Sequence, residues 1–126
     1  MPTNLYVGVV EDDESVRRSL LRLLRQAGLQ PIGFASAEDF LVDSMRDHFR
    51  CLLLDVRLGG MSGIELQQRL IALGVHKLVI YITSHDDPDA KAEALSTGGC
   101  VGYFSKTDSG PLIIEAIRRA AHAAGP

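Results

Sequence analysis

The sequence predicts an α/β fold: a doubly wound parallel sheet of five strands, with five helices distributed over its two faces. Five short apolar runs alternate along the chain with five longer stretches in which apolar residues recur at helical spacing. Glycine or proline stands at most of the boundaries between these segments. Strict alternation of this kind favours right-handed crossovers and a parallel sheet, in which any site lies at the carboxyl ends of the strands.

The first half of the chain contains two strand and helix pairs. In order, the expected elements are a strand at 5–10, a helix at 15–27, a strand at 29–34, and a helix that starts after Ser36 and carries Phe40, Leu41 and Met45. Gly28 ends the first helix. Pro31 lacks a backbone N–H to share with a neighbour, so it places the second strand at an edge of the sheet.

The second half contains three further pairs. The expected elements are strands at 51–55, 78–82 and 101–104 and helices at 63–73, 89–97 and 110–123. Gly74 and the pair at 98–99 end two of the helices, whereas Pro88 and Pro111 fit the first turns of the last two. The strand at 51–55 is apolar until its last residue, Asp55, as expected of a strand buried on both faces.

Length and composition restrict the class of protein. The 126 residues suit a single domain, 1–126, with a core of about 4–123. The net charge is −3 and the arginines are scattered among acids, so we expect no direct nucleic-acid binding. With no membrane-spanning run or signal segment, the sequence predicts a cytoplasmic protein that does not bind membranes. Cys51 and Cys100 lack any metal or redox spacing and are expected to be free thiols.

Polar residues follow four of the predicted strands, all at the edge where parallel strands end. They are Glu11, Asp12 and Asp13 after the first strand, Asp55 at the end of the third, Thr83 and Ser84 after the fourth, and Ser105 and Lys106 after the fifth. Two carboxylates about 4 Å apart repel by roughly 4 kcal/mol at an effective dielectric constant near 20, so the acids call for a cation. Oxygen ligands with open positions suit Mg²⁺ (or Mn²⁺), which commonly bridges carboxylates to a phosphoryl group. Lys106 and Thr83 would then hold the remaining phosphoryl oxygens.

These residues carry a family resemblance over essentially the whole chain. The motifs are Glu11-Asp12, Asp55 followed by Met61-Ser62-Gly63, Ile82-Thr83-Ser84, and Gly102-Tyr103-Phe104-Ser105-Lys106. Together they resemble the receiver domain of two-component response regulators, a CheY-like fold with strand order 2-1-3-4-5. The pattern is most similar to receivers of LuxR/FixJ-type transcription regulators. The chain is then either a stand-alone receiver or the N-terminal part of a longer regulator.

The resemblance implies a role for each residue of the site. Asp55 is the expected phosphoacceptor, and Asp12, Glu11, Asp55 and the backbone carbonyl of Arg57 are the expected metal ligands. Thr83 and Lys106 would contact the phosphoryl group, and Tyr103 would be the aromatic residue of the switch. The implied partner is a sensor histidine kinase or a phosphotransfer protein, with an unidentified downstream protein and a phosphorylation-linked homodimer as further expectations.

Three features of the site stay open at the level of sequence. Asp12-Asp13 could replace Glu11-Asp12 as the acidic pair, although Asp13 also suits the first turn of the following helix. Many receivers have proline after the lysine, whereas Thr107 stands here, so the Lys106–Thr107 bond is either cis or trans. Arg57 and His85 lie two residues beyond Asp55 and Thr83, where the family tunes hydrolysis; they either screen attacking water or are solvated loop residues.

Two alternative functions compete with the phosphoacceptor switch. A small phosphatase is disfavoured because the chain has no phosphate-binding GxxxxGK[ST] loop and has Arg57 where a haloacid-dehalogenase-type enzyme needs a second acid. A phosphorylation-independent binding module of the same fold would be expected to lack Asp55 or Lys106, and both are present. We therefore expect no enzymatic activity beyond the domain's own phosphorylation and dephosphorylation.

Overall fold

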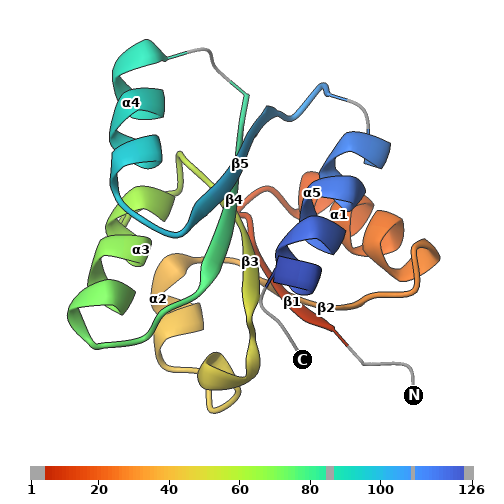
Figure 1. The fold of residues 1–126 in the computed structure, drawn as a ribbon, viewed down its shortest axis with the longest axis horizontal. Helices are drawn as coiled ribbons and strands as arrows, with labels where there is room; N and C mark the ends of the chain where they lie inside the picture. Colours follow the sequence, from red (N-terminus) through yellow and green to blue (C-terminus); the bar gives the residue numbers. More distant parts are fainter. Residues whose placement is uncertain (1–4, 85–86, 109, 124–126) are drawn as a thin grey trace.

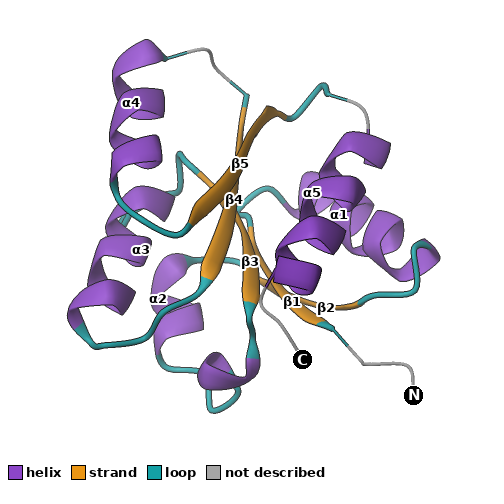
Figure 2. Ribbon diagram, viewed as in Figure 1, coloured by secondary structure: helices purple, strands orange, loops and turns teal. Residues whose placement is uncertain are grey.

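A computed structural model describes residues 5–84, 87–108 and 110–123, and it contains the predicted parallel sheet with helices on both faces (Figures 1 and 2). The strand order is β2-β1-β3-β4-β5, and each neighbouring pair is parallel. The strands are β1 (Tyr6–Val10), β2 (Gln30–Phe34), β3 (Cys51–Asp55), β4 (Leu78–Thr83) and β5 (Cys100–Ser105). The helices are α1 (Glu14–Gln26), α2 (Ala37–Leu41), α3 (Gly63–Ala72), α4 (Pro88–Ser96) and α5 (Gly110–Ala123).

The sheet separates two apolar cores. Helices α2, α3 and α4 cover one face, and α1 and α5 cover the other (Figure 1). Alternate residues of β3 serve the two cores: Leu52 and Leu54 pack with α2 and α3, and Leu53 packs with α1 and α5. All five residues of β3 are buried, which accounts for the apolar run that precedes Asp55.

Helix α2 is shorter than the sequence predicts. It ends at Leu41, and a 3₁₀ turn follows at Arg46–His48 instead of further α-helix. The carboxylate of Asp43 accepts the backbone N–H of Met45 at 2.8 Å, which gives this segment an alternative to helical hydrogen bonding. Met45 still packs against the core, as its apolar character predicts, but the prediction that it lies in the helix is wrong.

Two local expectations are confirmed: the strand with Pro31 lies at an edge of the sheet, and Cys51 and Cys100 are free thiols. Pro31 lies in β2, an edge strand that pairs with β1 alone. Cys51 and Cys100 are free thiols that begin β3 and β5, on either side of β4, and burial raises the pKa of Cys51 to about 12. No cis peptide bond occurs among the described residues, so the Lys106–Thr107 bond is trans. Within that same part of the chain, each helix is too short or too polar to span a bilayer.

Candidate functional site at the carboxyl edge of the sheet

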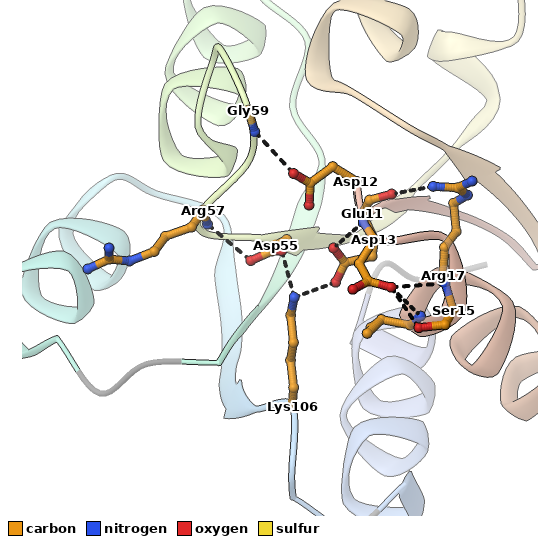
Figure 3. Close-up of polar contacts among 10 residues, drawn as sticks. Glu11, Asp12, Asp13, Ser15, Arg17, Asp55, Arg57, Gly59 and Lys106 are labelled. Atoms are coloured by element: carbon orange, nitrogen blue, oxygen red, sulfur yellow. Dashed lines mark hydrogen bonds and ion pairs between the residues drawn. The ribbon is translucent and has the colours of Figure 1, made fainter.

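The fold brings the polar strand ends together at one edge of the sheet (Figure 3). Glu11 follows β1, Asp55 ends β3, Thr83 ends β4, and Lys106 follows β5. In the sheet, β3 lies between β1 and β4, so Asp55 occupies the centre of this edge. The arrangement is the crevice that a doubly wound sheet forms where its strand order reverses.

Three carboxylates form the acidic part of the site. Glu11, Asp12 and Asp55 each offer an oxygen atom, and these atoms lie within 4.8 Å of one another. Glu11 is fully buried and Asp55 is 2% exposed, whereas Asp12 lies at the surface. An oxygen-only donor set with one solvent-facing member fits Mg²⁺, which keeps several of its own water ligands.

Lys106 supplies the positive charge opposite these acids. Its Nζ lies 2.7 Å from Asp55 Oδ2 and 2.6 Å from Glu11 Oε1, the second contact being an ion pair without hydrogen-bond geometry. Burial raises the pKa of Glu11 to about 7, against the lowering effect of Lys106 and with a further raising effect of Asp55. Burial alone would lower the pKa of Lys106, but its contacts with Asp55 and Glu11 outweigh burial and raise it.

The loop after β3 closes tightly around Asp55. The N–H of Arg57 donates to Asp55 Oδ1 at 3.0 Å, so both carboxylate oxygens of Asp55 accept hydrogen bonds. Ser62 caps α3 through a capping box with Glu65. A Cβ atom at Gly63 would lie 2.3 Å from the backbone oxygen of Asp55, which is closer than any real Cβ contact. The Ser62-Gly63 pair therefore starts α3 directly against the Asp55 backbone.

Asp13 has a structural role at the start of α1. It is the N-cap residue, and its Oδ1 accepts the backbone N–H groups of Ser15 and Val16 at 2.9 and 3.1 Å. Its hydrogen bonds, led by the Ser15 hydroxyl, lower its pKa. Because the Asp13 carboxylate is engaged in capping, the geometry favours Glu11 and Asp12 as the acidic pair.

Thr83 and Tyr103 lie on the opposite side of Asp55 from the acids. Thr83 is 4% exposed, and its backbone carbonyl accepts the N–H of Lys106 at 2.8 Å. Tyr103 in β5 lies beside Tyr81 in β4, with ring centroids 6.2 Å apart, and Lys91 Nζ from α4 lies 5.7 Å from the Tyr103 ring centre. The Tyr103 ring is half-buried between the sheet and α4.

The Arg57 side chain extends away from Asp55 (Figure 3). Its Nη2 lies 3.2 Å from Asp87 Oδ2, and Asp87 is the N-cap of α4. The sequence indicates Asp87 as a helix cap but gives no sign of this ion pair, since the partners are distant along the chain. His85, the other residue expected to tune hydrolysis, lies outside the described residues.

Comparison with known proteins identifies the family. The family model "Response regulator receiver domain" matches residues 7–118. The chain belongs to the response regulator receiver domains. Nodulation protein W of Bradyrhizobium diazoefficiens is 42% identical over 115 residues, which make up 91% of this chain and 50% of that protein. Transcriptional regulatory protein FixJ of Azorhizobium caulinodans is 38% identical over 118 residues, covering 94% of this chain and 56% of FixJ.

Solved structures agree with this assignment. The crystal structure of FixJ-N matches the receiver with a TM-score of 0.85 at 35% identity and covers 96% of both chains. Chemotaxis protein CheY4 of Vibrio cholerae matches with a TM-score of 0.83 at 20% identity, which shows the CheY-like fold alone. The receiver spans about half the length of the two relatives named above.

Proposed function

We propose that this receiver is phosphorylated on Asp55 and acts as a conformational switch. The observation that supports this most directly is the position of Asp55: buried, central at the carboxyl edge, with Lys106 Nζ 2.7 Å from one oxygen and two further acids beside it. In the proposed reaction an oxygen of Asp55 attacks the phosphorus atom of a phosphohistidine, the P–N bond breaks, and the imidazole of the donor leaves.

The neighbouring side chains divide the work of this transfer. Lys106 and Thr83 would contact the oxygens of the transferred group and stabilise the charge that they carry. Glu11, Asp12, Asp55 and the backbone carbonyl of Arg57 would hold Mg²⁺ (or Mn²⁺), whose charge offsets that of the acids and the phosphoryl group. The acids fit this ion because their oxygens converge within 4.8 Å and Asp12 faces solvent.

The proposed switch runs from Thr83 to Tyr103. Movement of the Thr83 hydroxyl toward a phosphoryl group would change the space next to β5, where the half-buried Tyr103 ring contacts Tyr81 and Lys91. The ring would then turn inward and alter the surface formed by α4 and β5. The downstream protein that reads this surface, and a phosphorylation-linked homodimer, belong to the same proposal.

The partner and the setting follow from family membership. Receivers of response regulators are phosphorylated by histidine kinases, so we propose a sensor histidine kinase or a phosphotransfer protein as the donor, acting in the cytoplasm. The receiver would catalyse only its own phosphorylation and dephosphorylation. We expect no direct contact with nucleic acid, in keeping with its net charge of −3.

Intact mass spectrometry tests this proposal. The receiver is incubated with acetyl phosphate in Mg²⁺ or in EDTA, and the expected result is a gain of one phosphoryl group in Mg²⁺ alone. Asp55→Asn should abolish the gain, whereas Asp47→Asn, which changes an exposed acid of the 3₁₀ turn, should retain it. No gain in the unmodified chain would instead support the phosphorylation-independent binding module.

A further inference from the structure

Arg17 of α1 reaches back to the loop that carries the acids. Its Nη1 donates to the backbone carbonyl of Glu11 at 2.8 Å (Figure 3). On the other side of the same residue, the N–H of Glu11 donates to the carbonyl of Phe34 in β2 at 3.0 Å. The end of β1 is therefore fixed from two elements at once, and one of the two contacts is a side chain.

These contacts restrict the backbone conformation of Asp12, whose carboxylate also accepts the N–H of Gly59 at 3.3 Å. The peptide group before Asp12 contains the Glu11 carbonyl, which Arg17 holds. The peptide group after Asp12 contains the N–H of Asp13, which donates to Glu11 Oε2 at 3.1 Å. With both flanking peptide groups held, the φ and ψ angles of Asp12 are restricted although its side chain lies at the surface.

Gly33, which has no side chain, leaves space for the Arg17 side chain. The Arg17 side chain passes over Gly33 of β2, where a Cβ atom would lie 3.1 Å from Arg17 Cδ and 3.3 Å from Arg17 Cγ. Arg17 is half-buried, in contrast to the adjacent Arg18, which is 76% exposed and pairs with Glu14 in the same helix. The Arg17 side chain is therefore packed against β2, whereas the Arg18 side chain lies in solvent.

We propose that Arg17 is a positioning residue for the metal site: by holding the Glu11 carbonyl, it aims the Asp12 carboxylate at the ion. This inference rests on the proposed function, because it takes Asp12 as a metal ligand. The inference also predicts a change in Mg²⁺ affinity, on loss of Arg17, in the opposite direction to the one that simple electrostatics predicts. A cationic side chain near three carboxylates should weaken the binding of another cation, so loss of its charge alone would strengthen Mg²⁺ binding. Loss of positioning would weaken it.

Two variants separate positioning from charge. Arg17→Met removes the charge and the donor together, whereas Gly33→Ala keeps the charge but places a methyl group 3.1 Å from both Arg17 Cδ and Leu21 Cδ1. We expect both to raise the Mg²⁺ dissociation constant, Arg17→Met by roughly tenfold, as for other groups that orient metal ligands. Arg18→Met is the matched control and should leave the constant within about twofold.

Isothermal titration of the full chain with MgCl₂ gives the dissociation constants, and amide NMR in EDTA gives a readout without metal. In Arg17→Met, the amides of Asp12 and Asp13 should lose heteronuclear NOE intensity relative to the unmodified chain. At saturating Mg²⁺, the phosphorylation rate with acetyl phosphate should stay within about twofold. Tighter or unchanged Mg²⁺ binding in Arg17→Met would overturn the inference alone, and an unmodified chain that binds no Mg²⁺ would overturn it together with the proposed metal site.

Discussion

Replacing Lys106 with methionine tests how the buried acids are kept in the fold. The substitution keeps an unbranched side chain that is one atom shorter, and it leaves Glu11 and Asp55 without their shared ammonium group. Removing one partner of a buried ion pair costs about 3–5 kcal/mol. Here the cost is smaller, because Lys106 is 17% exposed and Glu11 can take up a proton. Since the pKa of Glu11 is about 7, protonating it at pH 8 costs about 1.4 kcal/mol even beside Lys106.

We therefore expect Lys106→Met to lose about 2 kcal/mol of unfolding free energy at pH 8 in EDTA. At pH 5.5 the loss should fall below about 1 kcal/mol, because Glu11 is then protonated in both proteins and can donate a hydrogen bond to Asp55. Urea denaturation followed by circular dichroism measures both values. Lys91→Met is the control: Lys91 is exposed over the Tyr103 ring and its loss should cost less than about 1 kcal/mol at either pH. An equal loss at both pH values in Lys106→Met would refute the reasoning.

Three further predictions concern the same edge of the sheet. Gly63→Ala should lower the unfolding free energy by about 3 kcal/mol, because the added methyl group would lie 2.3 and 3.1 Å from backbone atoms. Gly59→Ala is the control: the nearest atom to its added methyl group is 3.9 Å away, so the unfolding free energy should change by less than about 0.5 kcal/mol. In EDTA the unfolding free energy of the receiver, measured by urea denaturation, should fall by about 2 kcal/mol between pH 5.5 and 8. The pKa of Glu11 is higher in the folded chain, so the stability that Glu11 contributes is lost as pH rises through about 7. Glu11→Gln should make the unfolding free energy much less dependent on pH. If the Arg57 guanidinium screens attacking water, Arg57→Ala should shorten the lifetime of the phosphorylated form about threefold. Asp87→Asn keeps the α4 cap but removes the ion pair with Arg57, so it should lengthen this lifetime. Intact mass measured over time gives the lifetimes, and equal lifetimes would contradict the screening role.

The fold was predictable because each element carries its own local signal. The apolar run of β3 and the glycines after α1, α3 and α4 mark boundaries that the structure reproduces within a few residues. The exception is α2, where the periodic spacing of Met45 predicted helix. There the Met45 N–H donates to the Asp43 carboxylate in place of a helical hydrogen bond, and such local competition leaves no trace in apolar periodicity.

The candidate site was predictable in its centre and not at its margins. Glu11, Asp55 and Lys106 lie at strand ends, so the rule that parallel strands end at one edge brings them together. The contacts of Arg17 with Glu11 and of Arg57 with Asp87 depend on where long side chains lie in three dimensions. Arginine on an exposed helix or in a loop is common, so sequence alone does not distinguish an arginine that contacts a distant residue from one that is solvated.

The sharing of Lys106 gives a physical reason for the expected metal dependence. One ammonium group balances both Glu11 and Asp55, and the proposed reaction requires the same group to contact the phosphoryl oxygens. When it does so, a fully buried carboxylate loses its counter-charge while further negative charge arrives beside it. The cost of leaving such a carboxylate unpaired is several kcal/mol, so a second cation is needed at the acids. The carboxylate of Asp12 is exposed, so the cation can reach it from solvent. For this reason we expect the orientation of this carboxylate, which Arg17 holds, to affect Mg²⁺ affinity more than the phosphorylation rate at saturating Mg²⁺.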